Sequence, residues 1–193
     1  MRLESIPCPL CAHPLFDIVY QGVDSSFGRL PDSTRSYYPT ASKGTLLNRV
    51  VRCKACGFVY TNPREHREDI LNKYEFYVDP LYVSEEDSRR KNARRIIAHL
   101  EKQRRPPGRW LDVGCSAGFL LHEAKRAGWD AFGLEPSRWA SEFARVHLNL
   151  NVVKGNMEDL GRYPHRHFDV VSMIVVLAHV IEPVRVISEI HRI

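Results

Sequence analysis

Four cysteines near the N-terminus have the type and spacing of a metal site. They form two C-x-x-C pairs, Cys8 with Cys11 and Cys53 with Cys56. Two such pairs can present four thiolates to one tetrahedral Zn²⁺, with Gly57 easing the second turn. Two disulfides are the alternative, but the first residues contain no apolar signal-peptide core, and free cysteines suit a reducing compartment. We therefore predict a zinc site here, with an insertion looping out between the pairs.

A second group of residues could bind an anionic small molecule. The segment 111–121 reads as a short apolar strand, a turn built on Gly114 and Gly118, and an apolar helix. A helix that begins directly behind such a turn points unpaired N–H groups at a ligand. Because Ser116 replaces the middle glycine of a dinucleotide motif, the spacing favours a ligand with a carboxylate over one with a diphosphate. An ordinary strand-to-helix turn is the alternative.

A carboxylate follows at the end of the next apolar run. Glu135 closes the segment 131–135 and stands 23 residues after Asp112. An acid at the tip of the second strand of a βαβ unit can accept hydrogen bonds from both hydroxyls of a ribose. Glu135 could instead cap the helix that opens at Ser137, and the two roles are compatible.

The second half of the chain resembles the class I S-adenosylmethionine-dependent methyltransferases, and the matching segments follow one another in the same order. The segments that carry the resemblance are Leu111 to Gly118, Gly133 to Glu135, Lys154 to Leu160 and Phe168 to Pro183. Two positions depart from the family pattern. The family usually has Asp where Asn156 stands, and it often has Glu at the position of Ala178.

The resemblance implies S-adenosylmethionine as the cofactor and assigns residues to its parts. The methionine part would be held by the glycine turn, the ribose by the acid and the adenine by the segment after the third strand. The corresponding residues are Asp112, Gly114, Cys115 and Gly118, then Glu135, then Asn156 and Met157. The thiol of Cys115 is expected to be a small buried group and not a nucleophile.

A histidine follows the expected fourth strand. His179 is the best candidate for a general base, because the ordinary pKa of histidine suits proton transfer near neutrality. A hydrogen-bonded structural histidine is the alternative reading. His165 and His167 lie in a polar loop and are weaker candidates.

The stretch between the two groups is aromatic and then basic. Residues 73–83 contain four aromatic side chains, and with residues 56–64 they resemble a bacterial methyltransferase subgroup. That subgroup has an N-terminal zinc module and is often linked to sugar or secondary-metabolite modification. We expect the aromatic residues to pack against the helix that follows, and a lid over the cofactor is the alternative.

That following helix has an apolar stripe and many basic residues. The stripe is Ala93, Ile96, Ile97 and Leu100, and eight lysines and arginines lie between residues 89 and 105. Nucleic acid could bind there, but a solvated outer face is favoured because the net charge of the chain is only +5.

These observations predict an α/β protein with a Rossmann-like parallel sheet of the class I methyltransferase type, incomplete with about four strands, behind a small zinc-ribbon-like module. We expect the zinc module in residues 1–66, a helical linker in 67–108 and the partial cofactor domain in 109–193. The apolar run 170–177 is predicted to be a buried strand that becomes an exposed edge if the chain ends at Ile193. Such an edge would favour self-association.

The composition is that of a cytoplasmic protein without membrane spans. The chain is 44% hydrophobic and 26% charged, and the run 170–181 is too short to cross a bilayer. Three functions remain open: a methyltransferase acting on a small molecule such as a nucleotide-linked sugar or secondary metabolite, a ribosomal-RNA base methyltransferase, or a truncated protein that binds the cofactor or partners without catalysis. The small-molecule enzyme is favoured.

Overall fold

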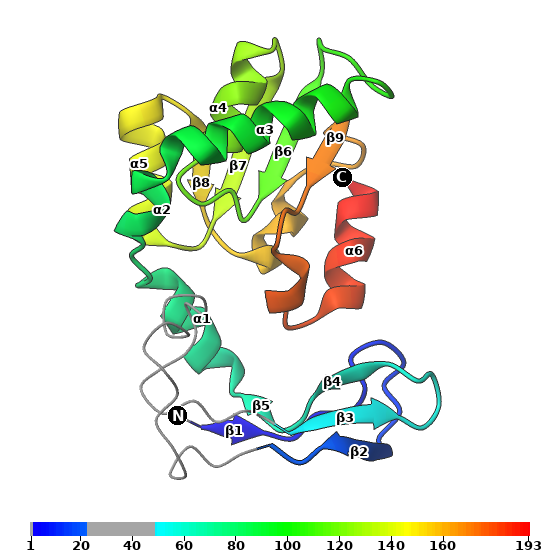
Figure 1. Ribbon diagram of the computed structural model, residues 1–193. Coiled ribbons are helices and arrows are strands. Elements are labelled where there is room, and N and C mark those ends of the chain that lie inside the picture. Colours follow the sequence, from blue (N-terminus) through cyan, green and yellow to red (C-terminus); the bar gives the residue numbers. More distant parts are fainter. Residues whose placement is uncertain (1, 23–48) are drawn as a thin grey trace. The chain divides into compact units, whose positions relative to one another are not determined.

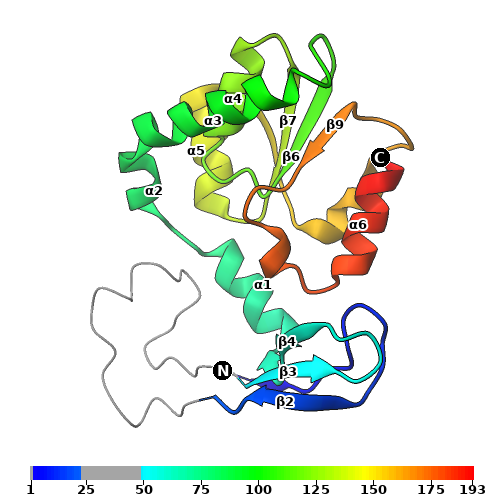
Figure 2. The same ribbon diagram turned by 45° about the vertical axis from the view of Figure 1, so that its right-hand side comes forward.

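The computed structural model describes residues 2–22 and 49–193, which form two compact units (Figures 1 and 2). The units are Met1–Lys73 and Tyr74–Ile193. The boundary falls inside helix α1 (Arg67–Glu75), so it divides the segment 67–108 that we expected to be a linker. Most of the expected insertion between the cysteine pairs lies outside the described residues.

The first unit is built from short antiparallel strands. Strands β2 (Phe16–Tyr20), β3 (Val50–Cys53) and β4 (Val59–Thr61) pair in that order, and β1 (Leu3–Glu4) pairs with β5 (Arg64–Glu65). Among residues 2–22 and 49–73, the buried apolar core consists of Cys8, Val51, Cys53 and Tyr60. Asn62 is fully buried and exchanges two hydrogen bonds with the backbone of Ile6, which ties the two ends of the unit together.

The second unit is an α/β structure around a parallel sheet. Its strands are β6 (Arg109–Val113), β7 (Asp130–Glu135), β8 (Asn151–Lys154) and β9 (Val170–Ser172), and all of their pairings are parallel, in the order β8-β7-β6-β9. The helical segments are α2 (Pro80–Ser84), α3 (Glu86–Leu100), α4 (Phe119–Arg126), α5 (Arg138–Leu148), η2 (Met157–Arg162), η3 (Leu177–His179) and α6 (Pro183–Arg192). This arrangement confirms the predicted fold class.

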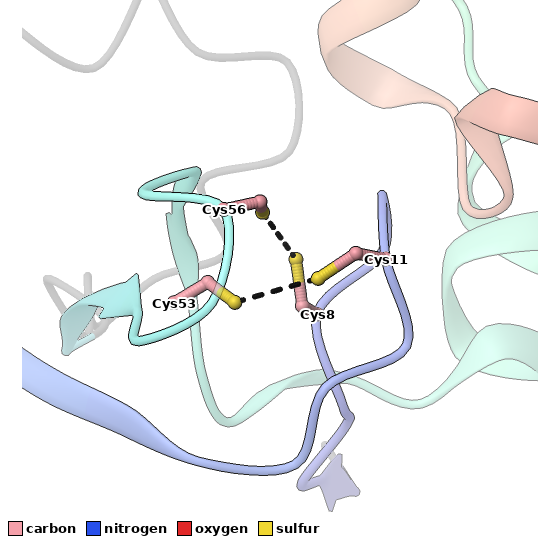
Figure 3. A group of neighbouring side chains, drawn as sticks. All are labelled: Cys8, Cys11, Cys53 and Cys56. Carbon is pink, nitrogen blue, oxygen red and sulfur yellow. Dashed lines mark hydrogen bonds between the residues drawn. The ribbon is translucent and has the colours of Figure 1, made fainter.

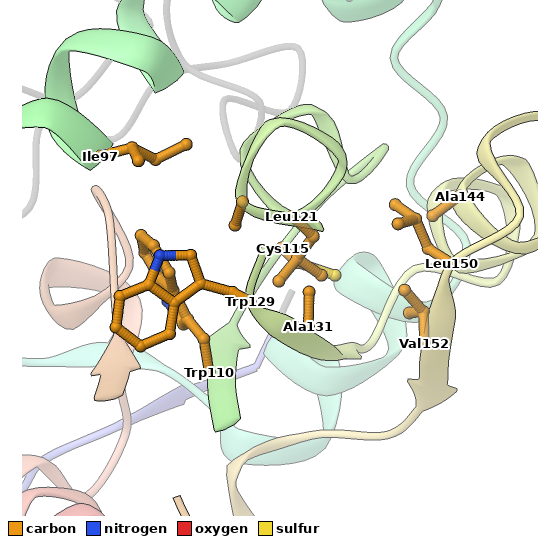
Figure 4. Close-up of a cluster of buried hydrophobic side chains, with 10 residues drawn as sticks. Ile97, Trp110, Cys115, Leu121, Trp129, Ala131, Ala144, Leu150 and Val152 are labelled. Atoms are coloured by element: carbon orange, nitrogen blue, oxygen red, sulfur yellow. The ribbon is translucent and has the colours of Figure 1, made fainter. Parts of the chain in front are cut away.

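Two apolar cores cover the two faces of the sheet. Because side chains alternate along a strand, Trp110 and Leu111 of β6 enter different cores. Trp110 packs with residues of α3, α4 and α5, among them Ile97, Leu121 and Ala144 (Figure 4). Leu111 packs with residues of η2 and α6. The strand is therefore buried on both sides, as expected for the middle of a parallel sheet.

The basic helix belongs to this unit. Helix α3 packs on α4, with Ala93 and Ile97 of the predicted stripe buried. Its arginines Arg90 and Arg94 both bond to Glu123 of α4, at 2.8 and 3.2 Å. Glu123 is nearly buried, so this ion pair fixes one helix on the other.

The predicted strand 170–177 is too long. The strand ends at Ser172, and the chain then turns through Val175, which has a φ of 59°. Residues Leu177–His179 form a 3-10 turn instead. The prediction failed because a run of apolar residues fits a strand and an apolar turn equally well. Residues 170–172 are half-buried and lie at the edge of the described sheet, not at its centre.

Within the described ranges, no helix combines the length and apolar character that crossing a membrane requires.

Candidate functional site

The turn after β6 is tight, and two of its positions require glycine. Gly114 and Gly118 have φ angles of 74° and 85°, which favour glycine. A Cβ at Gly114 would lie 2.6 Å from a methyl carbon of Val176, and one at Gly118 would lie 2.6 Å from a methyl carbon of Leu150. Gly118 is the N-cap of α4, so the first N–H groups of that helix open beside the turn.

Glu135 ends β7 next to this turn and holds it in place. One of its carboxylate oxygens accepts a hydrogen bond from the backbone N–H of Ser116, and the other accepts one from Ser137, both at 2.8 Å. Each oxygen keeps a second lone pair for another donor. Burial raises the pKa of Glu135, while the two N–H groups oppose this shift. Glu135 thus supports helix α5 and remains able to accept hydroxyl donors, so the two roles considered from sequence are compatible.

Asp112 lies at the end of β6, one strand away. Its carboxylate accepts a hydrogen bond of 2.6 Å from Ser172 of β9, and the Ser172 hydroxyl accepts one of 2.8 Å from the Trp110 indole. Burial raises the pKa of Asp112 to about 7, an effect that the Ser172 hydroxyl opposes and the nearby charge of Glu135 reinforces. A positively charged ligand group beside Asp112 would therefore stabilise its ionised form.

Cys115 points away from the turn and into the core. A Cβ at Gly133 of β7 would lie 2.7 Å from its sulfur, and the residue packs with Leu121 (Figure 4). Burial raises the pKa of the Cys115 thiol well above its ordinary value. Its thiol therefore has the buried structural position that we expected, and only its backbone lies at the turn.

Asn156 and Met157 follow β8, the next strand in the sheet. Asn156 is the N-cap of η2, where its side chain accepts from Glu158 N at 2.8 Å and its own N–H donates to Asp159 at 2.9 Å. Met157 is half-buried and packs against the core that contains Leu134. The three expected cofactor segments thus follow β6, β7 and β8, which are adjacent parallel strands, so they share one edge of the sheet.

His179 lies on the loop after β9, at the end of η3, and is exposed. Its ring meets the edge of the Tyr74 ring at a centroid distance of 6.1 Å. Its backbone N–H donates to Val176, the residue that packs over Gly114. Through this bond and the contact of Val176 with Gly114, the loop of His179 lies next to the glycine turn.

The four paired cysteines converge in the first unit (Figure 3). All four sulfurs lie within 4.8 Å of one another. The Cys8–Cys56 and Cys11–Cys53 sulfur pairs are each 3.5 Å apart. Four ligands at about 2.3 Å from a tetrahedral zinc ion would be roughly 3.8 Å apart. The donor set and its spacing therefore fit Zn²⁺.

The two cysteine pairs have the same backbone geometry. In each, the residue after the second cysteine donates its N–H to the carbonyl of the first: Ala12 to Cys8 at 2.8 Å and Gly57 to Cys53 at 3.0 Å. Backbone N–H groups of Cys56 and Ala55 also lower the pKa of Cys53 to about 6, against the opposing effect of burial. Within the same cluster the neighbouring thiols raise the pKa of Cys11 and Cys56, so without a metal the thiolate form is favoured at Cys53 and disfavoured at these two.

The sequence did not reveal the hydrogen bonds by which three serines hold Glu135 and Asp112. Ser116 and Ser137 reach Glu135 through their backbone N–H groups, and Ser172 reaches Asp112 through its hydroxyl. Ser116 and Ser137 were noted only as a turn position and a helix start. Ser172 was given no role, although it is the one polar residue in the apolar run 170–177.

Comparisons with known proteins match the part of the chain that contains the glycine turn and Glu135. A family described as "Methyltransferase domain" matches residues 85–193, more than half of the chain. The ubiquinone biosynthesis O-methyltransferase of Nitrosospira multiformis is 30% identical over 94 residues, which cover 46% of this chain and 39% of that protein. The protein of the same name from Shewanella sp. is 37% identical over 84 residues, covering 40% of this chain and 35% of that one. The chain thus matches little more than a third of the length of these relatives.

Solved structures of similar proteins carry related names. A Thermotoga maritima structure, described as a SAM-dependent methyltransferase and possible histamine N-methyltransferase, has a TM-score of 0.49 at 24% identity and covers 66% of this chain and 56% of its own. A SAM-dependent methyltransferase from Archaeoglobus fulgidus has a TM-score of 0.45 at 26% identity, covering 59% and 53%. With the family match over residues 85–193 and the glycine turn and acid in place, the chain belongs to the class I S-adenosylmethionine-dependent methyltransferases.

Proposed function

We propose that this protein transfers a methyl group from S-adenosylmethionine to a small-molecule acceptor. The observation that carries the proposal is the arrangement of Asp112, the glycine turn and Glu135 at the ends of two adjacent parallel strands. A carboxylate at each strand end and a helix N-terminus between them suit a ligand with an ammonium group, a carboxylate and a ribose.

The residues divide the cofactor among them. Asp112 would pair with the ammonium group, the N–H groups at the start of α4 would face the carboxylate, and the free lone pairs of Glu135 would accept the ribose hydroxyls. Asn156 and Met157 would border the adenine. The bound cofactor supplies a methyl group on a sulfonium, which is already electrophilic. The protein then has to align the acceptor with this methyl group and keep water out of the site. Where the acceptor needs it, the protein also removes a proton.

An oxygen acceptor is the class that the relatives support. The two relatives from Nitrosospira multiformis and Shewanella sp. are named O-methyltransferases. The N-terminal cysteine module resembles one found beside methyltransferases of sugars and secondary metabolites. A hydroxyl acceptor must lose its proton during transfer, so it needs a base near the reacting oxygen. His179 lies on the loop that packs against the glycine turn and is exposed to take that role.

The basic helix supports a small acceptor over RNA. Arg89 pairs with Glu85, the residue before α3, and Arg90 pairs with Glu86 on α3, at 2.7 and 2.6 Å. Arg90 also pairs with Glu123. Arginines committed to acidic partners contribute less to phosphate binding, since those partners repel phosphate.

We also propose that Cys8, Cys11, Cys53 and Cys56 hold one structural zinc ion. The ion would join the loop after β1 to the turn between β3 and β4, two segments far apart in the sequence. All four positions are taken by protein thiols, which leaves none for a reacting water.

Activity is tested with the full chain, methyl-labelled S-adenosylmethionine and a panel of nucleotide-linked sugars and other hydroxylated metabolites. We expect label in at least one acceptor and an equal amount of S-adenosylhomocysteine. Cofactor binding without transfer to any acceptor would favour the non-catalytic alternative. Label in added ribosomal RNA would mean that the acceptor is RNA and not a small molecule.

Replacement of His179 tests the base. In His179→Ala, we expect turnover of the hydroxylated acceptor to fall by 10²-fold or more, with unchanged affinity for the cofactor. His165→Ala, in the polar loop before β9, is the control and should retain full turnover. Unchanged turnover in His179→Ala would remove the assignment.

A further inference from the structure

The aromatic segment 73–83 runs along the same edge of the sheet as the cofactor residues. Its Glu75 bonds to Lys154 at the end of β8 at 2.6 Å, and to Arg138 at the start of α5 at 3.2 Å. Further along, the carbonyl of Tyr77 accepts a hydrogen bond of 2.7 Å from the hydroxyl of Ser137. Ser137 is also the N-cap of α5, so the segment is fastened where the Glu135 carboxylate is bound.

The segment then reaches the glycine turn through Tyr82. Asp79 caps α2 by accepting from Tyr82 N at 3.0 Å, which fixes the backbone of that short helix. The Tyr82 ring lies parallel to the ring of Phe119, the first residue of α4, with a centroid distance of 5.8 Å and an interplanar angle of 8°. The guanidinium of Arg89 lies 4.1 Å from the centre of the Tyr82 ring.

These contacts place the Tyr82 ring beside Phe119, the residue that directly follows Gly118 of the turn. Burial raises the pKa of Tyr82, which Arg89 opposes and Asp112 reinforces, and the Ser116 hydroxyl also interacts with the phenol. Two of these groups, Asp112 and Ser116, belong to the end of β6 and the turn expected to hold the methionine part, whereas Arg89 belongs to α3. Because its pKa is raised, the phenol keeps its proton at neutral pH and can donate a hydrogen bond.

We propose that Tyr82 is a positioning residue of the cofactor site, whose hydroxyl donates a hydrogen bond to the carboxylate of the methionine part of S-adenosylmethionine. This inference rests on the proposed cofactor site and adds to it a residue from outside the strands and their turns. The aromatic segment then acts as a strap across the cofactor edge, anchored by Glu75 and Ser137.

The charges at the turn support a carboxylate as the group that Tyr82 contacts. Asp112 attracts the ligand's ammonium group and repels its carboxylate, so the carboxylate must be met by donors elsewhere. The Tyr82 hydroxyl and the first N–H groups of α4 are donors at that place, and Phe119 joins the two because it stacks on Tyr82 and begins the helix. Helix N-termini favour anions as well.

The test measures affinity by calorimetry with the full chain and two probes. S-Adenosylhomocysteine carries the ammonium and carboxylate groups, whereas 5′-methylthioadenosine lacks both. We expect Tyr82→Phe to lower the affinity for S-adenosylhomocysteine by roughly 10-fold or more, because one hydrogen bond to a charged group is lost. The same substitution should change the affinity for methylthioadenosine by less than about two-fold.

Tyr77→Phe is the matched control. It removes a hydroxyl from the same strap, but that hydroxyl donates to Asp79 at 3.1 Å within the strap itself, and the backbone carbonyl that Ser137 bonds remains. We expect it to bind both probes like the wild type. Thermal unfolding of both variants checks that they are folded.

The outcomes separate this inference from the cofactor site. If Tyr82→Phe binds S-adenosylhomocysteine like the wild type while Glu135→Ala binds it weakly, the site stands and the role of Tyr82 is overturned. Equal weakening of both probes by Tyr82→Phe would also overturn it, since the hydroxyl would then not contact the methionine part. A folded wild type that binds neither probe would overturn the cofactor site and the inference together.

Discussion

Asp112 has the least usual environment among the expected cofactor residues. It is almost fully buried, accepts one hydrogen bond from Ser172, and has its pKa raised to about 7, with burial as the main cause. The carboxyl is thus ionised above pH 7 and neutral below it. A cationic ligand group prefers the ionised form, so ligand binding and loss of this proton are linked.

We predict that affinity for S-adenosylhomocysteine falls roughly tenfold as the pH is lowered from about 7.5 to about 6, because a proton must then be released from Asp112 on binding. Asp112→Asn should bind more weakly at pH 7.5 and should lose this dependence. Calorimetry at several pH values measures both. The same slope in the Asn variant would assign the titration to another group.

At the residue scale, the sequence predicted the candidate site residues that follow distinctive patterns, but not the residues that hold them in place. The glycine turn, Glu135 and the cysteine pairs follow local spacings that chemistry demands. The Ser172 hydroxyl bonds Asp112 across two strands 60 residues apart in sequence, and no local pattern specifies such a partner. Tyr82 is similar, since its ring stacking on Phe119 depends on where a separate helix packs.

At the scale of elements, helix α3 is held on α4 by a polar contact as well as by its apolar stripe. Burial would raise the pKa of Glu123, but Arg90 and Arg94 hold it below its ordinary value. The Arg90 side chain is only 14% exposed, so removal of the Glu123 charge would leave it largely buried, with the more exposed Glu86 as its remaining acidic partner. Removing one member of such a pair costs more than the pair contributes.

We predict that Glu123→Gln lowers the free energy of unfolding by about 2 kcal/mol, because Arg90 loses its buried partner. Glu86→Gln removes the exposed partner of the same arginine and should cost less than about 0.5 kcal/mol. Urea unfolding of both variants measures the difference. Equal losses would mean that the buried contact with α4 does not stabilise the packing.

The elements also show why the strand 170–177 was predicted too long. Apolar side chains continue to Leu177, yet residues 174 and 175 are exposed and the backbone at Val175 has a positive φ. Hydrophobicity alone marks both a strand and the apolar wall of a binding site. By contrast, α5 was predictable because Ser137 caps its start and Asn149 ends it in a left-handed conformation.

At the scale of the whole molecule, the two units differ in what stabilises them. The second unit has two apolar cores on a parallel sheet, whereas the described part of the first has a core of four buried apolar residues, of which Cys8 and Cys53 belong to the cysteine cluster. A core of that size does not hold a domain together without a cross-link. The boundary after Lys73 falls inside the helix α1, where no turn or change in composition marks it in the sequence.

We predict that the purified chain contains about one zinc ion and that Cys53→Ser loses it, because three thiolates bind zinc less tightly than four. Cys115→Ser changes the remaining cysteine, which lies in the other unit, and should keep the metal. Elemental analysis after gel filtration gives the ratio of zinc to protein. A metal-free, folded wild type would contradict the zinc site.

The central claim is that the edge formed by Asp112, the glycine turn and Glu135 binds S-adenosylmethionine. The most direct measurement is a calorimetric titration of the zinc-loaded chain with S-adenosylmethionine, beside Glu135→Ala and the exposed control Glu142→Ala on α5. We expect saturable binding with one site per chain, weakened roughly tenfold or more in Glu135→Ala and unchanged in Glu142→Ala, since only Glu135 would accept the ribose hydroxyls. Absence of binding by the folded wild type, or equal binding by all three proteins, would contradict the account.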